Sequence, residues 1–229
     1  MWRLPVGSGH WDGFDVLDEA ELARHTRFRQ AADRDRYQAA HVGARLLLGR
    51  YLGVPSDRLR FSQHCRHCGA EHGKPMVADV ATKLDFSLTH SGSWVAIAVA
   101  AEPVGLDVQE LEAGPDVAAL SRAVLSPAEL RWWTGQPADA ARSAFFCYWA
   151  RKEALLKATG HGLAVPMNTI TLAPPVEPAR LVEWAADRPL DGPVQLQDLE
   201  AGPGYAAAVA MLSGLPIRLI QAEFRPMDP

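Results

Sequence analysis

The first quarter of the chain has apolar residues spaced as they are on helices. From Asp18 to Gly53 they recur at every third or fourth position, and Asp18 is a suitable N-cap. The second segment in this range ends on Gly53, two residues before Pro55, and glycine and proline in these places favour the end of a helix. The pattern predicts two helices, followed by an irregular stretch from Arg58 to Pro75.

The centre of the chain has the composition of β-strands. The segments LDFSLTHSGSWVAIAVAAE, at 84–102, and PVGLDVQEL, at 103–111, are rich in apolar and β-branched residues and are separated at Glu102 and Pro103. An antiparallel hairpin fits these two segments best.

The rest of the chain repeats this order of elements. Residues 115–144 have the pattern of short helices, one of which starts with a capping signal at Ser126. A longer helix is expected from about Ser143 to Thr159, where Gly160 ends it. Three strands should follow, in the segments NTITLAPP, PVQLQDL and GYAAAVAML.

Helices followed by strands, twice over, predict an α+β fold with two similar halves rather than a doubly wound sheet. We place the halves at residues 1–102 and 103–229. A weak internal sequence similarity supports this division. Trp94 is the first residue of WVAIAVA and Tyr205 is the first residue of YAAAVA, and each follows a turn that contains glycine.

Composition and charge exclude several classes of protein. With 48% apolar and 22% charged residues, the 229-residue chain resembles ordinary globular proteins. Its apolar runs are far shorter than the roughly 18–20 residues of a membrane span, and its N-terminus lacks a secretion signal. We therefore expect a cytoplasmic protein without a membrane partner. A net charge of −4 argues against a general nucleic-acid binder.

The expected long helix has charged residues among its apolar positions. In a helical projection Lys152 and Glu153 lie within the aromatic and leucine arc, Lys157 lies at its edge, and Ala154 and Ala158 lie on the open side. One interpretation is a solvated i, i+4 ion pair of Glu153 with Lys157, worth about 0.2–0.5 kcal/mol. The other is that a carboxylate held against aromatic surface needs a cation or a metal, which makes Glu153 a candidate metal ligand or base.

A second acid occupies a mainly apolar strand. Alternation places Asp107 and Gln109 on the same face of the segment 103–111. Taken alone, such an aspartate is usually a turn or edge residue. Together with Glu153 it would supply two oxygen ligands to an octahedral Mg²⁺ site, which water and substrate phosphate oxygens complete.

The segment HCRHCGAEH at 64–72 has a possible zinc-binding pattern. Its candidate ligands are Cys65, Cys68 and His72, with His64 and His67 nearby. The C-x-x-C has no second pair, and three cysteines without a secretion signal argue against a disulfide framework. A loop with reduced thiols is favoured, structural Zn²⁺ is the alternative, and Cys147 is interpreted as a packing residue.

Two segments match one known family. Gly105 to Gln109 (GLDVQ) resembles G-[IL]-D-[IV]-E, and Trp149 to Lys157 (WARKEALLK) matches W-x-x-K-E-[AS]-x-x-K, of the 4′-phosphopantetheinyl transferases of the surfactin-synthetase-activating (Sfp) type. The chain departs from the family pattern at Gln109, where many members have an acid, and at Ser87, which replaces an amide. Supporting matches are Gly73-Lys74-Pro75, the segment FSLTHSG from Phe86 to Gly92, Gly160 to Leu163, and Pro203-Gly204-Tyr205.

The resemblance implies an activity and an architecture. The phosphopantetheine arm of coenzyme A would be transferred to a serine of an acyl carrier protein or a peptidyl carrier protein domain, and adenosine 3′,5′-bisphosphate would be released. The family fold is two similar α+β halves with coenzyme A and Mg²⁺ between them. The N-terminal half would contact the adenine and 3′-phosphate, and the C-terminal half would hold the metal and catalytic residues. Such enzymes activate the carriers of fatty acid, polyketide and nonribosomal peptide biosynthesis, and we expect a monomer.

The resemblance also assigns roles to individual residues. The implied metal ligands are Asp107 and Glu153, with Gln109 contributing through its carbonyl, through water or not at all. Glu153 would take the proton of the carrier serine, Lys157 would steady the departing phosphate, and His90 would contact phosphate. The residues implied to contact coenzyme A are Arg24, Arg29, Arg36, Lys74, Pro75, Thr89, His90 and Lys157.

Two other functions stay open at this point. The chain could be a non-enzymatic interaction module in which a zinc-bound loop and exposed Trp132 and Trp133 dock a protein. It could also be a Mg²⁺-dependent hydrolase of nucleotides, although it has no phosphate-binding loop of the G-x-x-x-x-G-K-[ST] type. If the partner is a carrier protein, which is expected to be acidic, its docking surface should lie near residues 111–135, which include Arg122 and Arg131.

Overall fold

Helices and strands occur in both of the predicted halves. The elements of the first half are β1 (Trp2–Leu4), α1 (Glu19–Arg27), α2 (Ala31–Leu52), β2 (Arg60–His64), β3 (Glu71–Ala78), β4 (Asp85–Ser91) and β5 (Trp94–Ala100). Those of the second half are β6 (Val104–Glu110), α3 (Val117–Val124), α4 (Pro127–Thr134), α5 (Ala138–Thr159), β7 (Ile170–Leu172), β8 (Leu181–Trp184), β9 (Val194–Asp198), β10 (Tyr205–Leu212) and β11 (Ala222–Glu223). Short 3₁₀ turns lie at Phe14–Val16, Ser56–Arg58, Gly162–Ala164 and Met167–Thr169.

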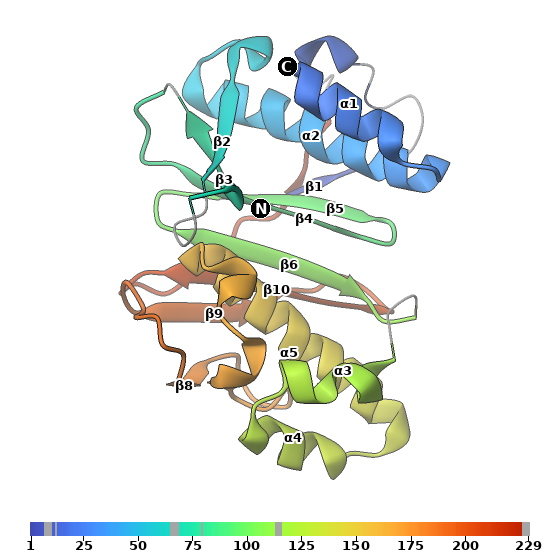
Figure 1. Ribbon diagram of the computed structural model, residues 1–229, viewed down its shortest axis with the longest axis vertical. Helices are drawn as coiled ribbons and strands as arrows, with labels where there is room; N and C mark the ends of the chain where they lie inside the picture. Colours follow the sequence, from blue (N-terminus) through green and yellow to red (C-terminus); the bar gives the residue numbers. More distant parts are fainter. Residues whose placement is uncertain (7–10, 12, 65–68, 79, 113–115, 226–229) are drawn as a thin grey trace.

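Two sheets lie between the long helices α2 and α5 (Figure 1). This computed structural model describes residues 1–229 except 7–10, 12, 65–68, 79, 113–115 and 226–229. The first sheet has the order β11-β1-β5-β4 and the second has the order β6-β10-β9. The predicted α+β fold is therefore confirmed. Strand β11 crosses back to pair in parallel with β1. None of the described helices has the length and hydropathy that a membrane crossing requires.

The N-terminal helices follow their predicted signals. Asp18 caps α1 through a capping box with Glu21, and Gly53 ends α2 in the left-handed conformation, with φ of 65°. The core of this half lies between α2 and the first sheet, and its buried side chains include Leu4, Val42, Leu47, Leu48, Val95 and Ile97.

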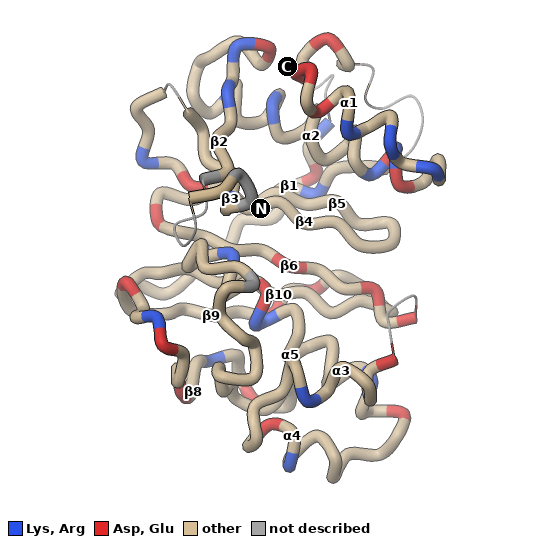
Figure 2. The backbone as a smooth tube through the Cα atoms, in the orientation of Figure 1, with Lys and Arg blue, Asp and Glu red and all other residues tan. Residues whose placement is uncertain are grey.

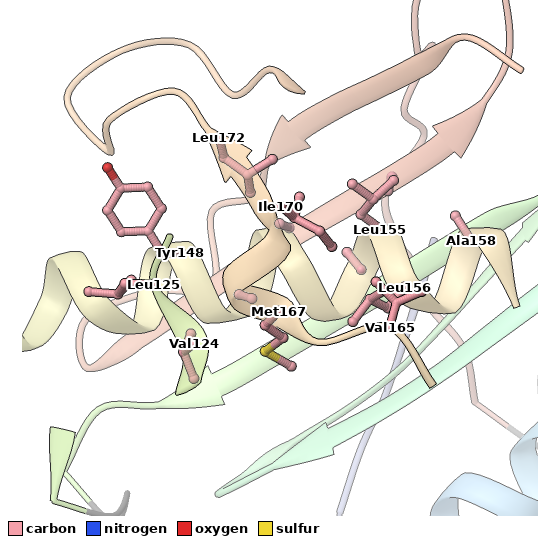
Figure 3. Close-up of a cluster of buried hydrophobic side chains, with 14 of the residues drawn as sticks. Val124, Leu125, Tyr148, Leu155, Leu156, Ala158, Val165, Met167, Ile170 and Leu172 are labelled. Carbon is pink, nitrogen blue, oxygen red and sulfur yellow. The ribbon is translucent and has the colours of Figure 1, made fainter. Parts of the chain in front are cut away.

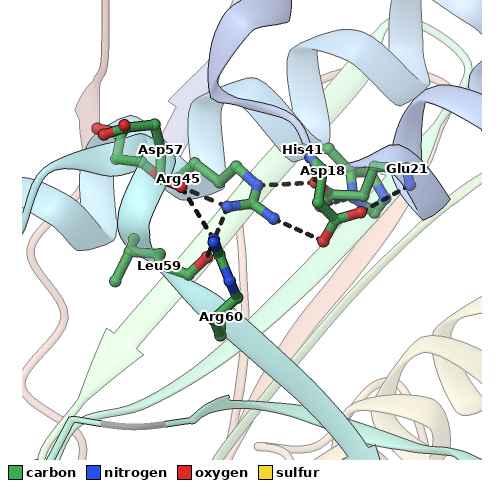
Figure 4. A network of polar contacts seen from close by, with 8 residues as sticks. Asp18, Glu21, His41, Arg45, Asp57, Leu59 and Arg60 are labelled. Carbon is green, nitrogen blue, oxygen red and sulfur yellow. Dashed lines mark hydrogen bonds and ion pairs between the residues drawn. The ribbon is translucent and has the colours of Figure 1, made fainter.

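Arg45 of α2 connects the start of α1 and the segment before β2 to α2 (Figure 4). Its side chain is fully buried and donates to the carboxylates of Asp18 and Glu21 at 2.9 and 2.7 Å and to the carbonyl oxygen of Leu59 at 2.8 Å. A guanidinium can be buried only when its donors have acceptors. Arg45 therefore fixes the start of α1 and the segment that leads into β2 relative to α2.

The prediction of an irregular stretch from Arg58 to Pro75 is wrong. Strands β2 and β3 pair in antiparallel fashion there, and the ring of Phe61 packs against Phe86 of β4 with centroids 5.6 Å apart. Glycine, histidine and proline interrupt the apolar alternation of this stretch, and the strand register shifts between Ser62 and His64. Both features hide the strands from a pattern based on period two.

The prediction that segments 84–102 and 103–111 pair as a hairpin is also wrong. The first segment contains a complete hairpin, β4–β5, with its turn at Gly92. Strand β6 of the second segment pairs with β10 in the other sheet. Strand β5 already pairs with β1 on one edge and β4 on the other, so it has no edge left for β6.

Helix α5 begins earlier than predicted, at Ala138 instead of about Ser143, after Pro137. It ends as expected, because Gly160 adopts the left-handed conformation with φ of 70°. Figure 3 shows the hydrophobic cluster that surrounds this helix. The cluster includes Val124, Leu125, Tyr148, Leu155, Leu156, Val165, Met167, Ile170 and Leu172.

The predicted exposure of Trp132 and Trp133 is wrong. Both side chains are half-buried, the ring of Trp132 packs edge-on against Tyr148, and the ring of Trp133 lies beside Phe145. The indole of Trp133 also donates to the carbonyl oxygen of Ala141 at 2.7 Å. The two tryptophans therefore attach α4 to α5 and do not form an open docking patch.

The helical projection misplaced part of α5. Ala154 and Ala158, expected on the open side, are buried. Lys152 is fully buried and donates to Glu129 at 2.5 Å and to the carbonyl oxygens of Val124 and Met167 at 2.7 and 3.0 Å. Burial lowers the pKa of Lys152 to about 8, and the charge of Glu129 opposes this shift. The partner of Lys152 is thus an acid inside the C-terminal half.

The two sheets are joined by side chains of β4 that bind the free edge of β6. Every second N–H of β6 points away from β10 and needs another acceptor. Four β4 side chains accept these hydrogen bonds at 2.7–3.2 Å. The pairs are Asp85 with Val104, Ser87 with Leu106, Thr89 with Val108, and Ser91 with Glu110. We call this set of contacts the β4–β6 ladder.

Replacing Lys152 with methionine should lower the free energy of unfolding by about 3–5 kcal/mol, because Glu129 would keep a buried charge without a cation. Urea unfolding measures the change. Arg180→Met is the matched control, since Arg180 pairs with Glu177 at the exposed surface and should lose less than about 1 kcal/mol. Equal losses in the two variants would contradict the buried pair.

Candidate functional site

Asp107 lies at the junction of the two halves. Only 3% of its surface is exposed. Its Oδ1 accepts hydrogen bonds from Lys157 at 2.7 Å and from Thr89 at 3.3 Å, and its Oδ2 accepts one from the Gln109 amide at 2.7 Å. Three donors compensate the burial of this carboxylate. Asp107 and Gln109 thus point to the same side of β6, as alternation predicted.

Helix α5 reaches Asp107 because Gly105 has no side chain. A Cβ at Gly105 would overlap the backbone of α5 at Ala154 and Ala158. At this crossing the ammonium of Lys157 donates to the carbonyl oxygen of Leu106 at 3.0 Å as well as to Asp107. The close approach of α5 and β6 therefore brings a lysine of the helix onto the strand aspartate.

Glu153, one turn before Lys157 on α5, lies near the same aspartate. Its half-buried position raises its pKa, the negative charge of Asp107 raises it further, and Lys157 acts in the opposite direction. Among the described residues, no group donates a hydrogen bond to the Glu153 carboxylate. The site therefore contains two neighbouring carboxylates and one ammonium, and one of the carboxylates has free ligand positions.

His90 and Arg36 lie on the N-terminal side of this site. Although part of the His90 ring is exposed, the surrounding protein lowers its pKa by partial burial, and the charges of Lys157, Arg36 and His41 act in the same direction. The Arg36 guanidinium donates to the carbonyl oxygen of Gly92 at 3.1 Å and pairs with Asp33. Cations from both halves therefore surround His90.

Lys74 lies at the other end of β4. Its ammonium pairs with Asp85 and donates to the carbonyl oxygen of Val104 at 2.7 Å. Pro75 follows it on β3 and is half-buried. Lys74 also lines a small cavity of about 70 Å³, whose other walls include Asp85, Pro103, Ala158, Thr159 and Gly160. From Asp85 to Ser91 strand β4 extends roughly 20 Å, so Lys74 and Arg36 mark opposite ends of the junction.

Arg24 and Arg29 are exposed on α1 and on its connection to α2, where basic positions gather (Figure 2). The charge of Arg24 acts on Tyr37, whose pKa burial raises to about 12. Among the described contacts, none links Arg24 or Arg29 to Asp107 or His90. The structure brings Arg36 to the site and leaves these two arginines at the surface.

The side chains of all the candidate zinc ligands, His64, Cys65, His67, Cys68 and His72, lie outside the described part of the structure. Within the described part of the chain, no group of three or more His, Cys, Asp or Glu side chains could hold a metal ion. Cys147 is half-buried and its pKa is raised to about 11 by burial, in agreement with a packing role.

Sequence reasoning missed the residues that connect the halves. These are Asp85, Ser87 and Ser91 of the β4–β6 ladder, and Tyr205, whose hydroxyl contacts Glu110 and Ser93. A signal was present, because small polar residues alternate with other residues along the segment DFSLTHS. Such a segment places its hydroxyls on one face of a strand.

Comparisons with known proteins agree on one family. The profile described as "4'-phosphopantetheinyl transferase superfamily" matches residues 103–210. The 4′-phosphopantetheinyl transferase HetI of Nostoc sp. is 33% identical over 79% of this chain and 76% of its own length. The 4′-phosphopantetheinyl transferase psf-1 of Bacillus pumilus is 31% identical over 80% of this chain and 73% of its own.

A solved structure with similarity to this chain is the holo-[acyl-carrier-protein] synthase of Thermotoga maritima. The match has a TM-score of 0.39 and 22% sequence identity, and it covers 48% of this chain and 62% of that one.

Replacing Gly105 with alanine should lower the free energy of unfolding by about 3 kcal/mol, because the new Cβ has no space against α5. Gly192→Ala is the control: no atom lies within 4 Å of a Cβ built there, so its change should stay within about 0.5 kcal/mol. Chemical denaturation of both variants measures the difference. If Gly105→Ala were as stable as its control, the close packing of α5 on β6 would be refuted.

Proposed function

This chain belongs to the 4′-phosphopantetheinyl transferase superfamily, and from that premise we propose that it transfers phosphopantetheine from coenzyme A to a serine of apo acyl or peptidyl carrier proteins. Enzymes of this family use coenzyme A as donor and act on carrier proteins. The observation that carries the proposal is the meeting of Asp107, Glu153 and Lys157 where α5 crosses β6. In the reaction, the serine oxygen bonds to the β-phosphorus of coenzyme A, and the bond from that phosphorus to the bridging oxygen breaks. Adenosine 3′,5′-bisphosphate leaves.

The donor set fits Mg²⁺. Asp107 and Glu153 offer hard carboxylate oxygens, and the proximity of their charges favours a cation between them. Asp107 accepts three hydrogen bonds from the protein, which leaves acceptor capacity on a group with about four lone-pair positions. Mg²⁺ typically takes one or two protein carboxylates and completes its shell with water and phosphate. When bound, it would neutralise pyrophosphate charge.

Gln109 is better suited to orienting Asp107 than to binding metal. Its amide nitrogen donates to Asp107 Oδ2, so its side chain is already engaged with a carboxylate. We propose that Asp107 and Glu153 are the protein ligands and that Gln109 supports the first of them.

Glu153 is the proposed acceptor of the serine proton. A carboxylate has two oxygens, so one can bind the cation while the other accepts a proton. The Glu153 carboxylate is half-buried and has no hydrogen-bond donor among the described residues, so it can face an incoming hydroxyl. The proton would reach it directly or through a water molecule.

The cations at the junction are proposed to bind the nucleotide and phosphates. Lys157 donates a hydrogen bond to Asp107 and would balance the negative charge of the leaving phosphate. His90 and Arg36 are proposed to contact phosphates. Lys74 is proposed to contact a phosphate and Pro75 to pack by the adenine, as the family motif implies. Arg24 and Arg29 are proposed only as outer contacts of the 3′-phosphate, since both are exposed.

Thr89 has a different position from the one expected of a coenzyme A contact. Its side chain is buried, donates to Asp107 and accepts from the Val108 N–H. We therefore propose that Thr89 orients Asp107 and acts on the substrate through it.

The halves divide this work between them. Residues 1–102 are proposed to contribute most contacts to the nucleotide, and residues 103–229 the carboxylates and Lys157. The surface near residues 111–135 is proposed to receive the acidic carrier, because Arg122 and Arg131 are exposed there on α3 and α4.

Incubation with coenzyme A, Mg²⁺ and an apo-carrier protein should add the mass of one phosphopantetheine to the carrier. Glu153→Gln should slow this addition by about 100-fold or more, because the amide cannot accept the serine proton. Glu183→Gln, an exposed acid on β8, is the matched control and should react like the unchanged protein. Removal of divalent ions by a chelator should stop the reaction, and added Mg²⁺ should restore it. Full activity of Glu153→Gln would refute the proposed role of Glu153.

Lys157→Ala should reduce kcat by about 100-fold, because one cation at the reacting phosphate is lost. Its free energy of unfolding should fall by about 1.5–3 kcal/mol, because the buried Asp107 loses its charged donor but keeps Thr89 and Gln109. Lys83→Ala, at an exposed lysine of the N-terminal half, should change neither quantity. Steady-state kinetics and thermal unfolding on the same preparations measure both effects. A large loss of stability with normal kcat would show a structural role for Lys157 instead.

A further inference from the structure

The turn between β4 and β5 is held by both halves of the molecule. The Tyr205 hydroxyl of β10 accepts a hydrogen bond from the Ser93 N–H at 3.0 Å and donates to Glu110 Oε1 at 3.1 Å. The Glu110 N–H donates to Ser91 Oγ at 2.9 Å. From the other side, Arg36 donates to the carbonyl oxygen of Gly92. The turn therefore bridges α2 and the second sheet.

Only glycine fits at position 92 of this turn, for two reasons. Its φ of 54° is in the left-handed region, which favours glycine. A Cβ at this position would also overlap the Tyr205 hydroxyl and the Glu110 carboxylate. The space at Gly92 is thus filled by the two side chains that hold the turn.

The held turn lies beside the proposed nucleotide contacts. His90 is two residues before Gly92, and Arg36 binds Gly92 itself. Asp107 is on the same strand as Glu110. The position of His90 and Arg36 relative to Asp107 therefore depends on the contacts of Tyr205 and Glu110 with the turn.

We propose that Tyr205 is a positioning residue for coenzyme A binding: through the Ser91–Ser93 turn it sets His90 and Arg36 at the correct place relative to the carboxylates of β6 and α5. This inference rests on the proposed function, which gives His90 and Arg36 their phosphate contacts. It predicts that loss of the Tyr205 hydroxyl weakens binding of coenzyme A and leaves the chemical step intact.

Tyr205→Phe removes the hydroxyl and keeps the ring that lies near Trp94. We expect the KM and the calorimetric Kd for coenzyme A to rise about 3- to 10-fold, because the hydroxyl that holds the turn to the second sheet is lost. We expect kcat to stay within about twofold, because Asp107, Glu153 and Lys157 are untouched. The Ser93 amide should exchange its hydrogen about tenfold faster, because it loses its acceptor.

Tyr51→Phe is the matched control. It also removes a tyrosine hydroxyl that accepts one hydrogen bond, from the Trp2 indole at 3.0 Å, but inside the N-terminal half. It should change neither coenzyme A binding nor exchange at Ser93. Glu110→Gln keeps an oxygen acceptor for Tyr205 and should behave like the unchanged protein, whereas Glu110→Leu should behave like Tyr205→Phe.

Two results would overturn the inference. One is an unchanged Kd for coenzyme A in Tyr205→Phe, which would reduce the contact to a structural one. The other is a fall in kcat with unchanged KM, which would assign Tyr205 to the carboxylates. Coenzyme A binding and hydrogen exchange are measured without turnover, so they test Tyr205 separately from the transfer reaction that Glu153→Gln tests.

Discussion

The structure depends on how the free edge of β6 obtains its hydrogen bonds. This edge is buried between the halves, and buried N–H groups without acceptors are costly. Side-chain oxygens of β4 supply the acceptors, and the two residues of every pair are 19 positions apart. A constant spacing means that the strands run in the same direction without slipping. One set of short side chains thus fixes the position of the first sheet on the second.

The site follows from the three contacts of β6. The β4–β6 ladder holds one edge, β10 pairs with the other, and α5 crosses at Gly105. The Asp107 carboxylate receives donors from Thr89 of β4, Lys157 of α5 and Gln109 of β6 itself, which makes its burial tolerable. Lys157 has two functions in this arrangement, since it also donates to the free carbonyl oxygen of Leu106. The Lys157 ammonium therefore contributes both to the packing of α5 on β6 and to the proposed reaction.

Sequence patterns predicted local features well and long-range neighbours poorly. The ends of α2 and α5 followed from Gly53 and Gly160, because a glycine cap is a local signal. The pairing of β1 with β11 joins residues about 220 positions apart in the chain and leaves no local pattern. The helical projection showed that Lys152 and Glu153 faced inward. It could not show that Lys152 pairs with Glu129 while Glu153 lies near Asp107. Neighbouring positions on a helix point in different directions and so contact different elements.

The side chains of the β4–β6 ladder differ in length along the junction. Ser87, Thr89 and Ser91 reach β6 with hydroxyls bonded directly to Cβ, so the strands are close along this part. Asp85 uses a carboxylate, which extends one bond further, and the cavity lined by Lys74 lies beside it. A serine at position 87, where an amide is typical of the family motif, fits the narrow part because only one short acceptor is needed there. The ladder therefore places its one longer side chain at the end of the junction that contains this cavity.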